Sequence, residues 1–338
     1  MTKEKTFNWD TLRQPILVIS TVVGRGMYNI GEAITETFPD KSNTSHIAIE
    51  DFLPRNAVNE DLKRYEIISN RFPFLLYLIY KIPIFYYRKY FREKYFKSSN
   101  LMELKTKIES IRPKTIVCVS HRPAFWVSNL KRMEKMDFEL WGILGEYGNT
   151  LGWKYIFWES MNRFLSPVDR KELKFDIPIH VKYLKIDLPV RQKFCELSKT
   201  KGDVDNVLLV CGFWGQGPLC AILKVLTKEM PQLKLHVVCG ENIGLYNKIK
   251  SFFYNTSHIH LYGVTESLAP LLEKCASVIT KPGISTILEC RASHRKMFLL
   301  KGMPIAEDNN ARYAIAHFNA QWFNKDVFKQ WHASVTLK

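Results

Sequence analysis

Three short segments in the second half of the sequence combine residue types that could bind a phosphorylated sugar. The first is GFWGQGPL, which places Gly212, Gly215 and Gly217 between an apolar run and a helix-like segment. Glycines let backbone N–H groups approach a phosphate closely, and the positive end of a helix dipole attracts it. A plain tight turn explains the same glycines, so this segment alone leaves both interpretations open.

The second segment, SVITKPGISTILECRA, is typical of a strand, a Lys-Pro-Gly turn and a helix. Ser285, Thr286 and their amides could hold a pyrophosphate, and Glu289 could accept hydrogen bonds from ribose hydroxyls. The competing interpretation is a capping box of the form S-T-x-x-E, which would satisfy the first N–H groups of an ordinary helix without any ligand.

The third segment, KGMPIAEDNNARY, places Glu307, Asp308, Asn309 and Asn310 directly after another strand-like run. Carboxylates and amides at the end of a strand suit the hydroxyl groups of a sugar. A solvated loop with an Asx cap is the competing interpretation.

Two alternating series of strands and helices are predicted to position these segments. The strand-like runs of the first series lie at 16–21, 115–119, 140–144 and 164–167, and those of the second at 207–211, 235–239, 258–262, 278–280 and 296–300. Strands that alternate with helices predict an α/β protein with two doubly wound parallel sheets, which bind ligands at the carboxyl ends of their strands. Residues 183–194, with mixed charge, a proline and no clear period, are interpreted as the boundary. We therefore predict domains at 1–187 and 188–338, with the last helix free to pack back on the first domain.

Composition narrows the class of protein. A chain of 338 residues is too long for one ordinary core. Seven scattered cysteines without a C-x-x-C pair predict neither disulfides nor a zinc site. The amino terminus lacks the apolar core of a signal peptide, and the longest apolar stretch is shorter than the ~20 residues of a membrane span, so we expect a cytoplasmic protein. The net charge of +16 implies an acidic partner, which could be nucleic acid, anionic lipid or a phosphorylated substrate.

The order and spacing of several motifs resemble the donor domain of glycosyltransferase family 28, and within it monogalactosyldiacylglycerol synthases and bacterial diacylglycerol glucosyltransferases. The motifs are VLLVCGFWGQGPL, VVCGENIGLYNKI, YGVTESLAPLLEKCASVITKPGISTILECRA and MPIAEDNNARYA. A weaker resemblance continues through ILVISTVVGRGMYNIGEAI, VSHRP and LPVR. It implies a GT-B fold of two Rossmann-like domains facing a cleft, and inverting transfer of a sugar from a UDP-sugar to a lipid.

The resemblance also implies a donor site built from residues that follow five strands. UDP-sugar would be a co-substrate, and neither cofactor nor metal is expected, since helix N-termini and basic side chains typically stabilise the departing diphosphate in this family. The implied contacts are Gly215, Gln216, Gly217, Gly283, Ser285 and Thr286 with the pyrophosphate, Glu289 with the ribose, Gly240 and Val264 with the base, and Glu307, Asp308 and Asn310 with the sugar.

The turn after the first strand departs from the family. Where the lipid-glycosylating relatives carry G-G-G-H, with a histidine near the acceptor, this chain has Gly24, Arg25, Gly26 and Met27. Methionine cannot take a proton from the acceptor hydroxyl. Arg25 adds a cation that could favour an anionic acceptor or contact the donor phosphates, although an exposed turn arginine explains it equally well.

Two residues of the first domain remain as candidate bases. His121 in SHRP and Glu146 in GEYGN each follow a strand-like run. A structural, hydrogen-bonding histidine is the competing interpretation of His121. Ala306 replaces the glutamine that usually precedes the acidic pair, so the donor sugar stays open.

Residues 80–97, YKIPIFYYRKYFREKYFK, interleave aromatic and basic side chains. Aromatic rings favour the headgroup layer and cations favour anionic lipid, which predicts peripheral attachment to the inner face of a membrane. A core-packed helix with a solvated face is the alternative. Stacking on nucleic acid ranks last, because no nucleic-acid fold signature accompanies the segment, and we predict no nucleic-acid partner.

The leading prediction is a UDP-sugar-dependent hexosyltransferase with a membrane-lipid acceptor. Three alternatives stay open: a transferase with a soluble small-molecule acceptor, a nucleotide-sugar-binding protein without catalysis, suggested by Met27, and a nucleotide-sugar epimerase on the same fold.

Overall fold

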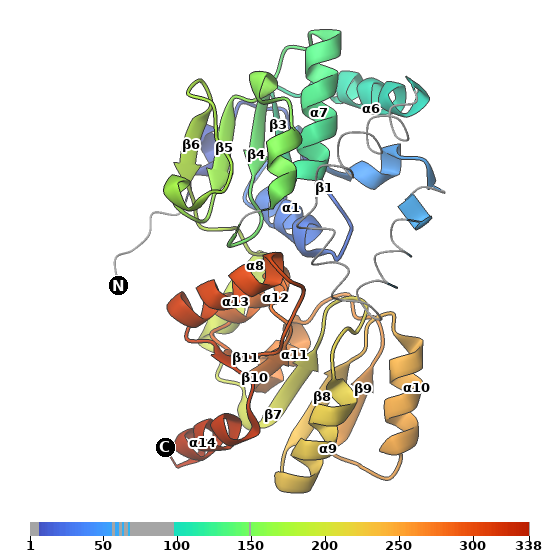
Figure 1. Ribbon diagram of the computed structural model, residues 1–338, viewed down its shortest axis with the longest axis vertical. Helices are drawn as coiled ribbons and strands as arrows, with labels where there is room; N and C mark the ends of the chain where they lie inside the picture. Colours follow the sequence, from blue (N-terminus) through green and yellow to red (C-terminus); the bar gives the residue numbers. More distant parts are fainter. Residues whose placement is uncertain are drawn as a thin grey trace. The chain divides into compact units, whose positions relative to one another are not determined.

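The computed structural model describes residues 7–55, 58–60, 63, 67, 98–148 and 150–337. The chain divides into two compact units (Figure 1). The first consists of Met1–Arg191 with Pro304–Ala306, and the second of Gln192–Met303 with Glu307–Lys338. Among the described residues, none of the helices is both long and apolar enough to span a membrane.

The first unit is built on a parallel sheet with the strand order β2-β1-β3-β4-β5-β6. Its described strands are β1 (Ile16–Ser20), β2 (Thr44–Ala48), β3 (Thr115–Val119), β4 (Glu139–Ile143), β5 (Arg163–Ser166) and β6 (Lys182–Lys185). Its described α-helices are α1 (Gly26–Glu36), α6 (Ser98–Ile111) and α7 (His121–Glu134). The chain moves in opposite directions from the neighbouring strands β1 and β3, so the turns after these two strands are adjacent.

The second unit repeats this plan with the order β12-β11-β10-β7-β8-β9. Its strands are β7 (Asp203–Val210), β8 (Lys234–Val238), β9 (Ile259–Tyr262), β10 (Cys275–Thr280), β11 (Lys296–Leu299) and β12 (Gln321–Trp322). Its helices are α8 (Gln192–Glu196), α9 (Leu219–Glu229), α10 (Ile243–Phe252), α11 (Ala269–Lys274), α12 (Ile284–Ala292), α13 (Ala306–His317) and α14 (Lys325–Thr336). The strand order reverses between β7 and β10, which pair directly with Val210 opposite Thr280.

Short 3₁₀ helices connect many of these elements. The described ones are η1 (Trp9–Thr11), η2 (Lys41–Asn43), η3 (Ile49–Phe52), η5 (Leu151–Tyr155), η6 (Trp158–Ser160), η7 (Arg170–Glu172) and η8 (Leu197–Lys199).

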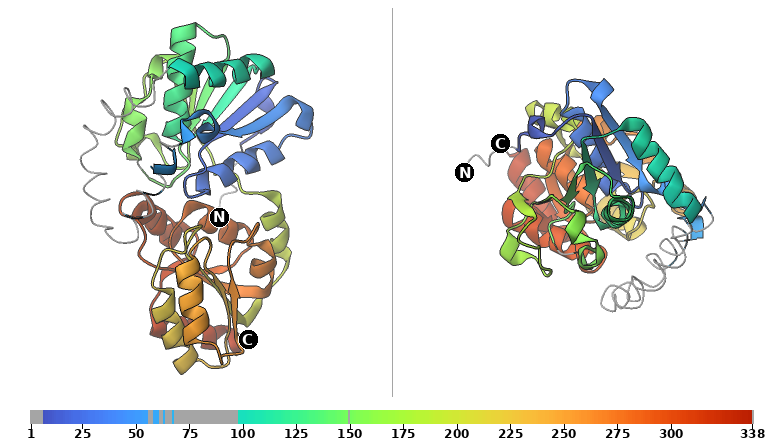
Figure 2. Two further views of the ribbon diagram at one scale, coloured as in Figure 1. Left: turned by 90° about the vertical axis from the view of Figure 1, so that its right-hand side faces the viewer. Right: turned by 90° about the horizontal axis from the view of Figure 1, so that it is seen from above.

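The predicted α/β class and the two parallel sheets are present, and all nine strand-like runs correspond to strands. Every residue of β1 and β3 is buried, as expected where helices cover both faces of a parallel sheet. Figure 2 shows α6 and α7 beside the first sheet from a second direction. The predicted boundary segment contains the end of β6 and the start of α8.

The last helix packs on the second sheet, although the sequence left it free to return to the first domain. Phe328 is fully buried in the core of the second unit, with its ring centroid 4.9 Å from that of Phe298 on β11. His332 lies 2.8 Å from the carboxylate of Asp205 on β7. Helix α14 therefore completes the hydrophobic core beneath β7 and β11.

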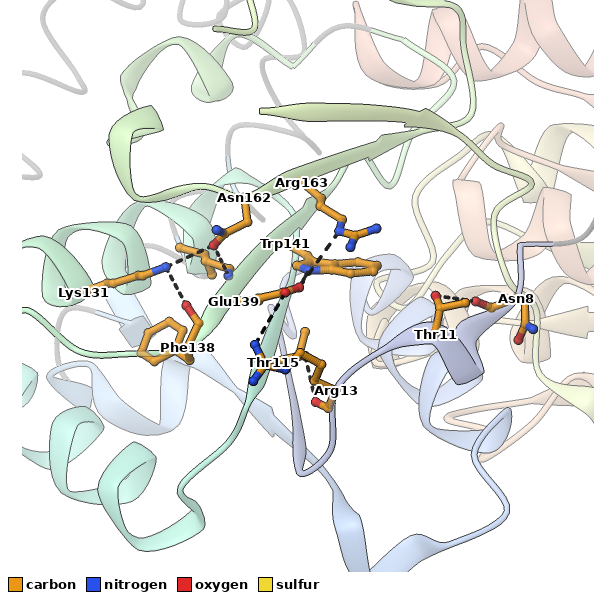
Figure 3. Close-up of polar contacts among 11 residues, drawn as sticks. Asn8, Thr11, Arg13, Thr115, Lys131, Phe138, Glu139, Trp141, Asn162 and Arg163 are labelled. Carbon is orange, nitrogen blue, oxygen red and sulfur yellow. Dashed lines mark hydrogen bonds and ion pairs between the residues drawn. The ribbon is translucent and has the colours of Figure 1, made fainter. Parts of the chain in front are cut away.

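Side chains fasten the amino-terminal edge of the first sheet (Figure 3). The side-chain oxygen Oδ1 of Asn162 accepts hydrogen bonds from a backbone N–H of β4, at 2.8 Å, and from Lys131 Nζ, at 3.1 Å. The Trp141 indole donates to Glu139 at 3.0 Å, and the Arg163 guanidinium lies 4.5 Å from the centre of a Trp141 ring. These contacts are structural and lie at the edge opposite the turns that carry the predicted site.

A buried arginine secures the start of the second unit. Arg295, between α12 and β11, is 5% exposed and donates to the Leu272 carbonyl at 2.6 Å and to the Thr200 carbonyl at 2.7 Å. Burial lowers the pKa of its guanidinium. The side chain ties the residues after η8 to α11, which leads into β10.

Replacing this arginine should destabilise the fold. Arg295→Met leaves buried carbonyl oxygens of Leu272 and Thr200 without donors, so we expect the free energy of unfolding to fall by about 3 kcal/mol. Chemical denaturation of the variant measures this loss. Arg312→Met removes an exposed arginine from α13 and should change stability by less than about 0.5 kcal/mol. Equal stabilities of the two variants would contradict the assigned role.

Candidate active site

All predicted donor-site residues lie beyond the carboxyl ends of strands in the second unit. Gly215, Gln216 and Gly217 follow β7, Gly240 follows β8 and Val264 follows β9, whereas the residues from Gly283 to Glu289 follow β10. In an open parallel sheet this edge binds ligands, above all where the strand order reverses. The glycine-rich turn after β7 and the Lys-Pro-Gly turn after β10 are the two turns at that reversal.

The turns after β7 and β8 touch through their backbones. Gly215 and Gly240 have φ angles of 56° and 59°, which favour glycine. A Cβ at Gly215 would lie 2.3 Å from the Cys239 carbonyl oxygen, and one at Gly240 would lie 2.0 Å from that of Phe213. The Glu241 N–H donates to the same Phe213 oxygen at 2.8 Å. The glycines therefore allow a close backbone contact between the two turns.

Helix α12 begins at the Lys-Pro-Gly turn, but not with the capping box that the sequence allowed. Its N-cap is Gly283, which has no side chain with which to cap the first N–H groups. Ser285 lies inside the helix and donates its hydroxyl to Glu289, one turn later, at 2.7 Å. The amino end of α12 thus points its N–H groups and positive dipole toward the β7–β10 reversal.

The third segment lies in a helix, and its Asn310 makes a contact that the sequence did not reveal. Glu307, Asp308 and Asn310 lie in the first turns of α13, several residues after β11, and not in a loop directly behind the strand. The fully buried Asn310 donates from Nδ2 to the Pro282 carbonyl oxygen at 3.2 Å. This contact positions the Lys-Pro-Gly turn.

Lys281 joins three segments of the site, and the sequence reasoning did not single it out. Its Nζ lies 2.8 Å from Glu307 Oε1 and 3.0 Å from Gln216 Oε1. The second carboxylate oxygen of Glu307 accepts the Met303 N–H at 2.6 Å. The Lys281 side chain is 15% exposed and that of Glu307 is 9% exposed. The sequence pattern that could have identified Lys281 is a lysine directly after a strand and before Pro-Gly and a helix.

The remaining donor candidates differ in exposure. Glu289 is 3% exposed, and Thr286 is also buried, whereas Ser285 is partly exposed. Val264 is 57% exposed in the turn after β9. An exposed apolar side chain at the ligand-binding edge of a sheet can cover a flat nucleotide base. A buried carboxylate can favour ligands whose hydroxyl groups donate hydrogen bonds to it.

In the first unit, a buried carboxylate fixes the turn that departs from the family. Glu50 in η3 accepts the Thr21 hydroxyl, the Val22 N–H at 3.1 Å and Arg122 Nη1 at 3.3 Å. Arg25 follows this turn with a φ of 59° and is the N-cap of α1. Glu50 therefore joins the end of β1 to the start of α7, a contact across 72 residues that the sequence reasoning missed.

Met27 packs on the segment that contains Glu146. A Cβ at Gly145 would lie 2.3 Å from Met27 Sδ and 3.4 Å from Ile30 Cδ1. Gly145 therefore allows α1 to pack closely on the turn after β4. The structure thus brings Met27 against the residue before the partly exposed Glu146.

His121, the other candidate base, is the first residue of α7. Its ring packs on Gly152, where a Cβ would lie 2.0 Å from the ring, and its centroid is 6.4 Å from that of Trp153. Burial and the Arg122 charge lower the pKa of His121 to about 3. The imidazole is therefore neutral at physiological pH and a weak proton acceptor.

Residues 80–97, the predicted interfacial segment, lie outside the described residues.

No protein-family model matches the chain. It is similar to processive diacylglycerol beta-glucosyltransferase of Bacillus cereus (strain G9842), with 23% identity over 317 residues that cover 88% of this chain and 79% of the relative. The enzyme of the same name from Bacillus thuringiensis (strain Al Hakam) is 22% identical over 319 residues, with the same coverage. The predicted resemblance to diacylglycerol glucosyltransferases is confirmed, and these relatives agree with the predicted hexosyltransferase.

Solved structures share the fold. Acinetobacter baumannii MurG aligns with a TM-score of 0.52 and 11% identity, covering 95% of this chain and 90% of its own. UDP-GlcNAc 2-epimerase from Neisseria meningitidis, bound to UDP-GlcNAc, aligns with a TM-score of 0.50, 12% identity and the same coverage. The predicted GT-B fold is confirmed.

The free energy of unfolding should fall at acidic pH because the folded protein partly buries His46. Burial lowers the pKa of His46 to about 4, and His46 Nε2 lies 2.7 Å from Ser20 Oγ. The unfolded histidine, with a pKa near 6.5, binds a proton that the folded one excludes. His46 therefore contributes stability above pH ~6.5 that is lost as the pH falls toward 4, by up to about 1.4 kcal/mol per pH unit.

Urea denaturation between pH 7 and 4.5 measures this loss. The free energy of unfolding should depend less on pH in His46→Gln than in the natural protein, whereas His180→Gln, at an exposed position, should leave the slope unchanged. A His46→Gln slope equal to that of the natural protein would contradict a neutral His46.

Proposed function

We propose that this protein is a glycosyltransferase that moves a sugar from a UDP-sugar to a membrane lipid, by inverting displacement and without a metal ion. The observation that carries the proposal is the meeting of Lys281 with the glycine-rich turn, through Gln216, at the β7–β10 reversal. A cation, accessible backbone amides at glycines and a helix N-terminus are the groups that bind a diphosphate.

The same groups account for the leaving-group chemistry. As the bond between the anomeric carbon and the diphosphate breaks, negative charge grows on the phosphate oxygens. Lys281 and the first N–H groups of α12 lie where they can stabilise this charge once the diphosphate is bound. This arrangement supports departure of UDP without a bound metal.

The remaining donor contacts are assigned by position. Glu289 on α12 would accept the ribose hydroxyls in place of Ser285, and the exposed Val264 would cover the uracil ring. Glu307 and Asp308, at the start of α13, would bind the sugar. Asn310 acts through the Pro282 carbonyl and is a positioning residue.

We assign the acceptor to the first unit, with Glu146 as the base. Glu146 follows the glycine on which Met27 packs, whereas the pKa of His121, near 3, makes that imidazole a poor proton acceptor. A lipid acceptor is supported by the similarity to diacylglycerol glucosyltransferases. Attachment to the inner face of a membrane follows as part of the proposal, for a cytoplasmic enzyme.

UDP should bind without added metal and stabilise the native state. In the presence of a chelator, UDP at one hundred times its Kd should raise the free energy of unfolding by about 2.7 kcal/mol. Glu289→Ala should weaken UDP binding by removing the ribose acceptor, whereas Glu273→Ala, at an exposed position on α11, should not. Calorimetric titration that shows equal UDP affinity in a folded Glu289→Ala variant would remove the nucleotide assignment.

Glu146→Gln should lower the transfer rate while UDP affinity stays nearly unchanged, since Glu146 belongs to the acceptor side. General-base catalysis typically contributes about 10² to 10⁴ in rate, and the loss should fall in that range. Single-turnover assays with UDP-glucose and vesicles that contain diacylglycerol measure it, with the exposed Glu159→Gln as the matched control. Full activity of Glu146→Gln would place the base elsewhere.

Mass spectrometry of the products separates the alternatives. A sugar attached to the lipid supports the proposal, and a sugar attached only to a soluble acceptor overturns its lipid part. An altered UDP-sugar without transfer would indicate an epimerase.

A further inference from the structure

We propose that Lys281 and Glu307 form a charge latch: the donor diphosphate displaces Glu307 from Lys281, and the released carboxylate then accepts hydrogen bonds from the donor sugar. The latch rests on the proposed function, because it takes the diphosphate to be the ligand at the β7–β10 reversal. It adds an energetic coupling between binding of the diphosphate and binding of the donor sugar. The residue assignments alone do not contain this coupling.

The first argument is the charge balance at Lys281. Its Nζ contacts one carboxylate oxygen, Glu307 Oε1 at 2.8 Å, and one neutral oxygen, Gln216 Oε1 at 3.0 Å. Both side chains of the ion pair are largely buried, and in such surroundings an unpaired charge is costly. In the unliganded protein Glu307 therefore occupies the place of an anion, and a diphosphate must compete with it for the lysine.

The second argument is the way in which Glu307 is held. Its Oε2 accepts the Met303 N–H at 2.6 Å, and the residue lies in the first turn of α13, where the helix dipole favours a carboxylate. Only Oε1 faces Lys281. Displacement from Lys281 therefore frees one oxygen, while Met303 and the helix keep the carboxylate charged and in position.

The third argument is the path by which a ligand reaches both partners. Lys281 follows β10 directly, and its stem lies on Gly212, since a Cβ there would be 2.7 Å from Lys281 Cε. Gly283, the N-cap of α12, also lies beside the pair, with its Cβ position 3.8 Å from Glu307 Oε1. A diphosphate at these glycines would meet Lys281, and a sugar attached to it would meet Glu307.

The latch predicts effects of opposite sign for the two partners. Lys281→Met removes the cation and should weaken UDP binding by about tenfold or more. Glu307→Gln removes the competing charge and should tighten UDP binding by about three- to tenfold, because UDP then displaces a neutral amide. A structural ion pair that merely shapes the site would instead weaken UDP binding in both variants.

Calorimetric titration of UDP, uridine and UDP-glucose into the full chain tests the latch. Uridine lacks the diphosphate, so its affinity should be unchanged in both variants. UDP-glucose should gain less than UDP, or lose affinity, in Glu307→Gln, because its sugar loses a charged acceptor. Lys301→Met and Glu103→Gln, which remove exposed charges, are the matched controls and should bind all three ligands as the natural protein does.

The outcomes separate the latch from the proposed function. If the natural protein binds UDP but Glu307→Gln weakens it, or if uridine affinity falls with UDP affinity, the latch is wrong and the function stands. If the natural protein does not bind UDP, both are wrong. Thermal unfolding checks each variant, and where Glu307→Gln does not fold, Glu307→Asp replaces it, because its shorter side chain also loosens the contact with Lys281 and should tighten UDP binding.

Discussion

The pairing of β7 with β10 is the constraint on which the donor side of this protein depends. The chain leaves these neighbouring strands in opposite directions, so their turns are adjacent although about seventy residues separate them. That adjacency brings the glycine-rich turn within reach of Lys281, and the interlocked backbones after β7 and β8 hold it there. The buried Asn310 then fixes the Lys-Pro-Gly turn from α13. The residues of the turns after β7, β8 and β10 can form one binding site only because the sheet places these three turns together.

Much of the fold could be predicted from the sequence, because buried parallel strands are continuous apolar runs. The strands that were missed lack this signal for physical reasons. In β2, TSHIA, four of five residues are only partly buried, and His46 and Ser45 interrupt the run. In β6, KYLK lies at the edge of the sheet with both lysines exposed, and β12 has two residues. The predicted capping box is absent because the helix starts earlier than S-T-x-x-E implies, at Ile284, with Gly283 as its N-cap.

The candidate site was predictable in its turns and less so in its contacts. Residue type and strand order place the glycines and carboxylates at one edge of the sheet. They do not reveal that Asn310 is buried against Pro282, or that Glu50 reaches Arg122 across 72 residues. Such long-range polar contacts depend on which side chains burial brings together, and a buried polar group must find a partner wherever the fold supplies one. The contacts of Lys281 and Glu50 therefore emerge only from the structure.

The charged groups of the proposed acceptor site and of the proposed donor site differ in how they are paired. At the proposed donor site, Lys281 and Glu307 form an ion pair that we propose a diphosphate displaces. In the first unit, where we propose that the acceptor binds, burial and the Arg122 charge lower the pKa of His121, and Glu50 accepts hydrogen bonds from three donors. A buried imidazole of this kind can orient an acceptor but is a poor proton acceptor. Because Met27 has no basic atom, the proposed transfer assigns proton removal to Glu146, in the segment after β4 on which Met27 packs.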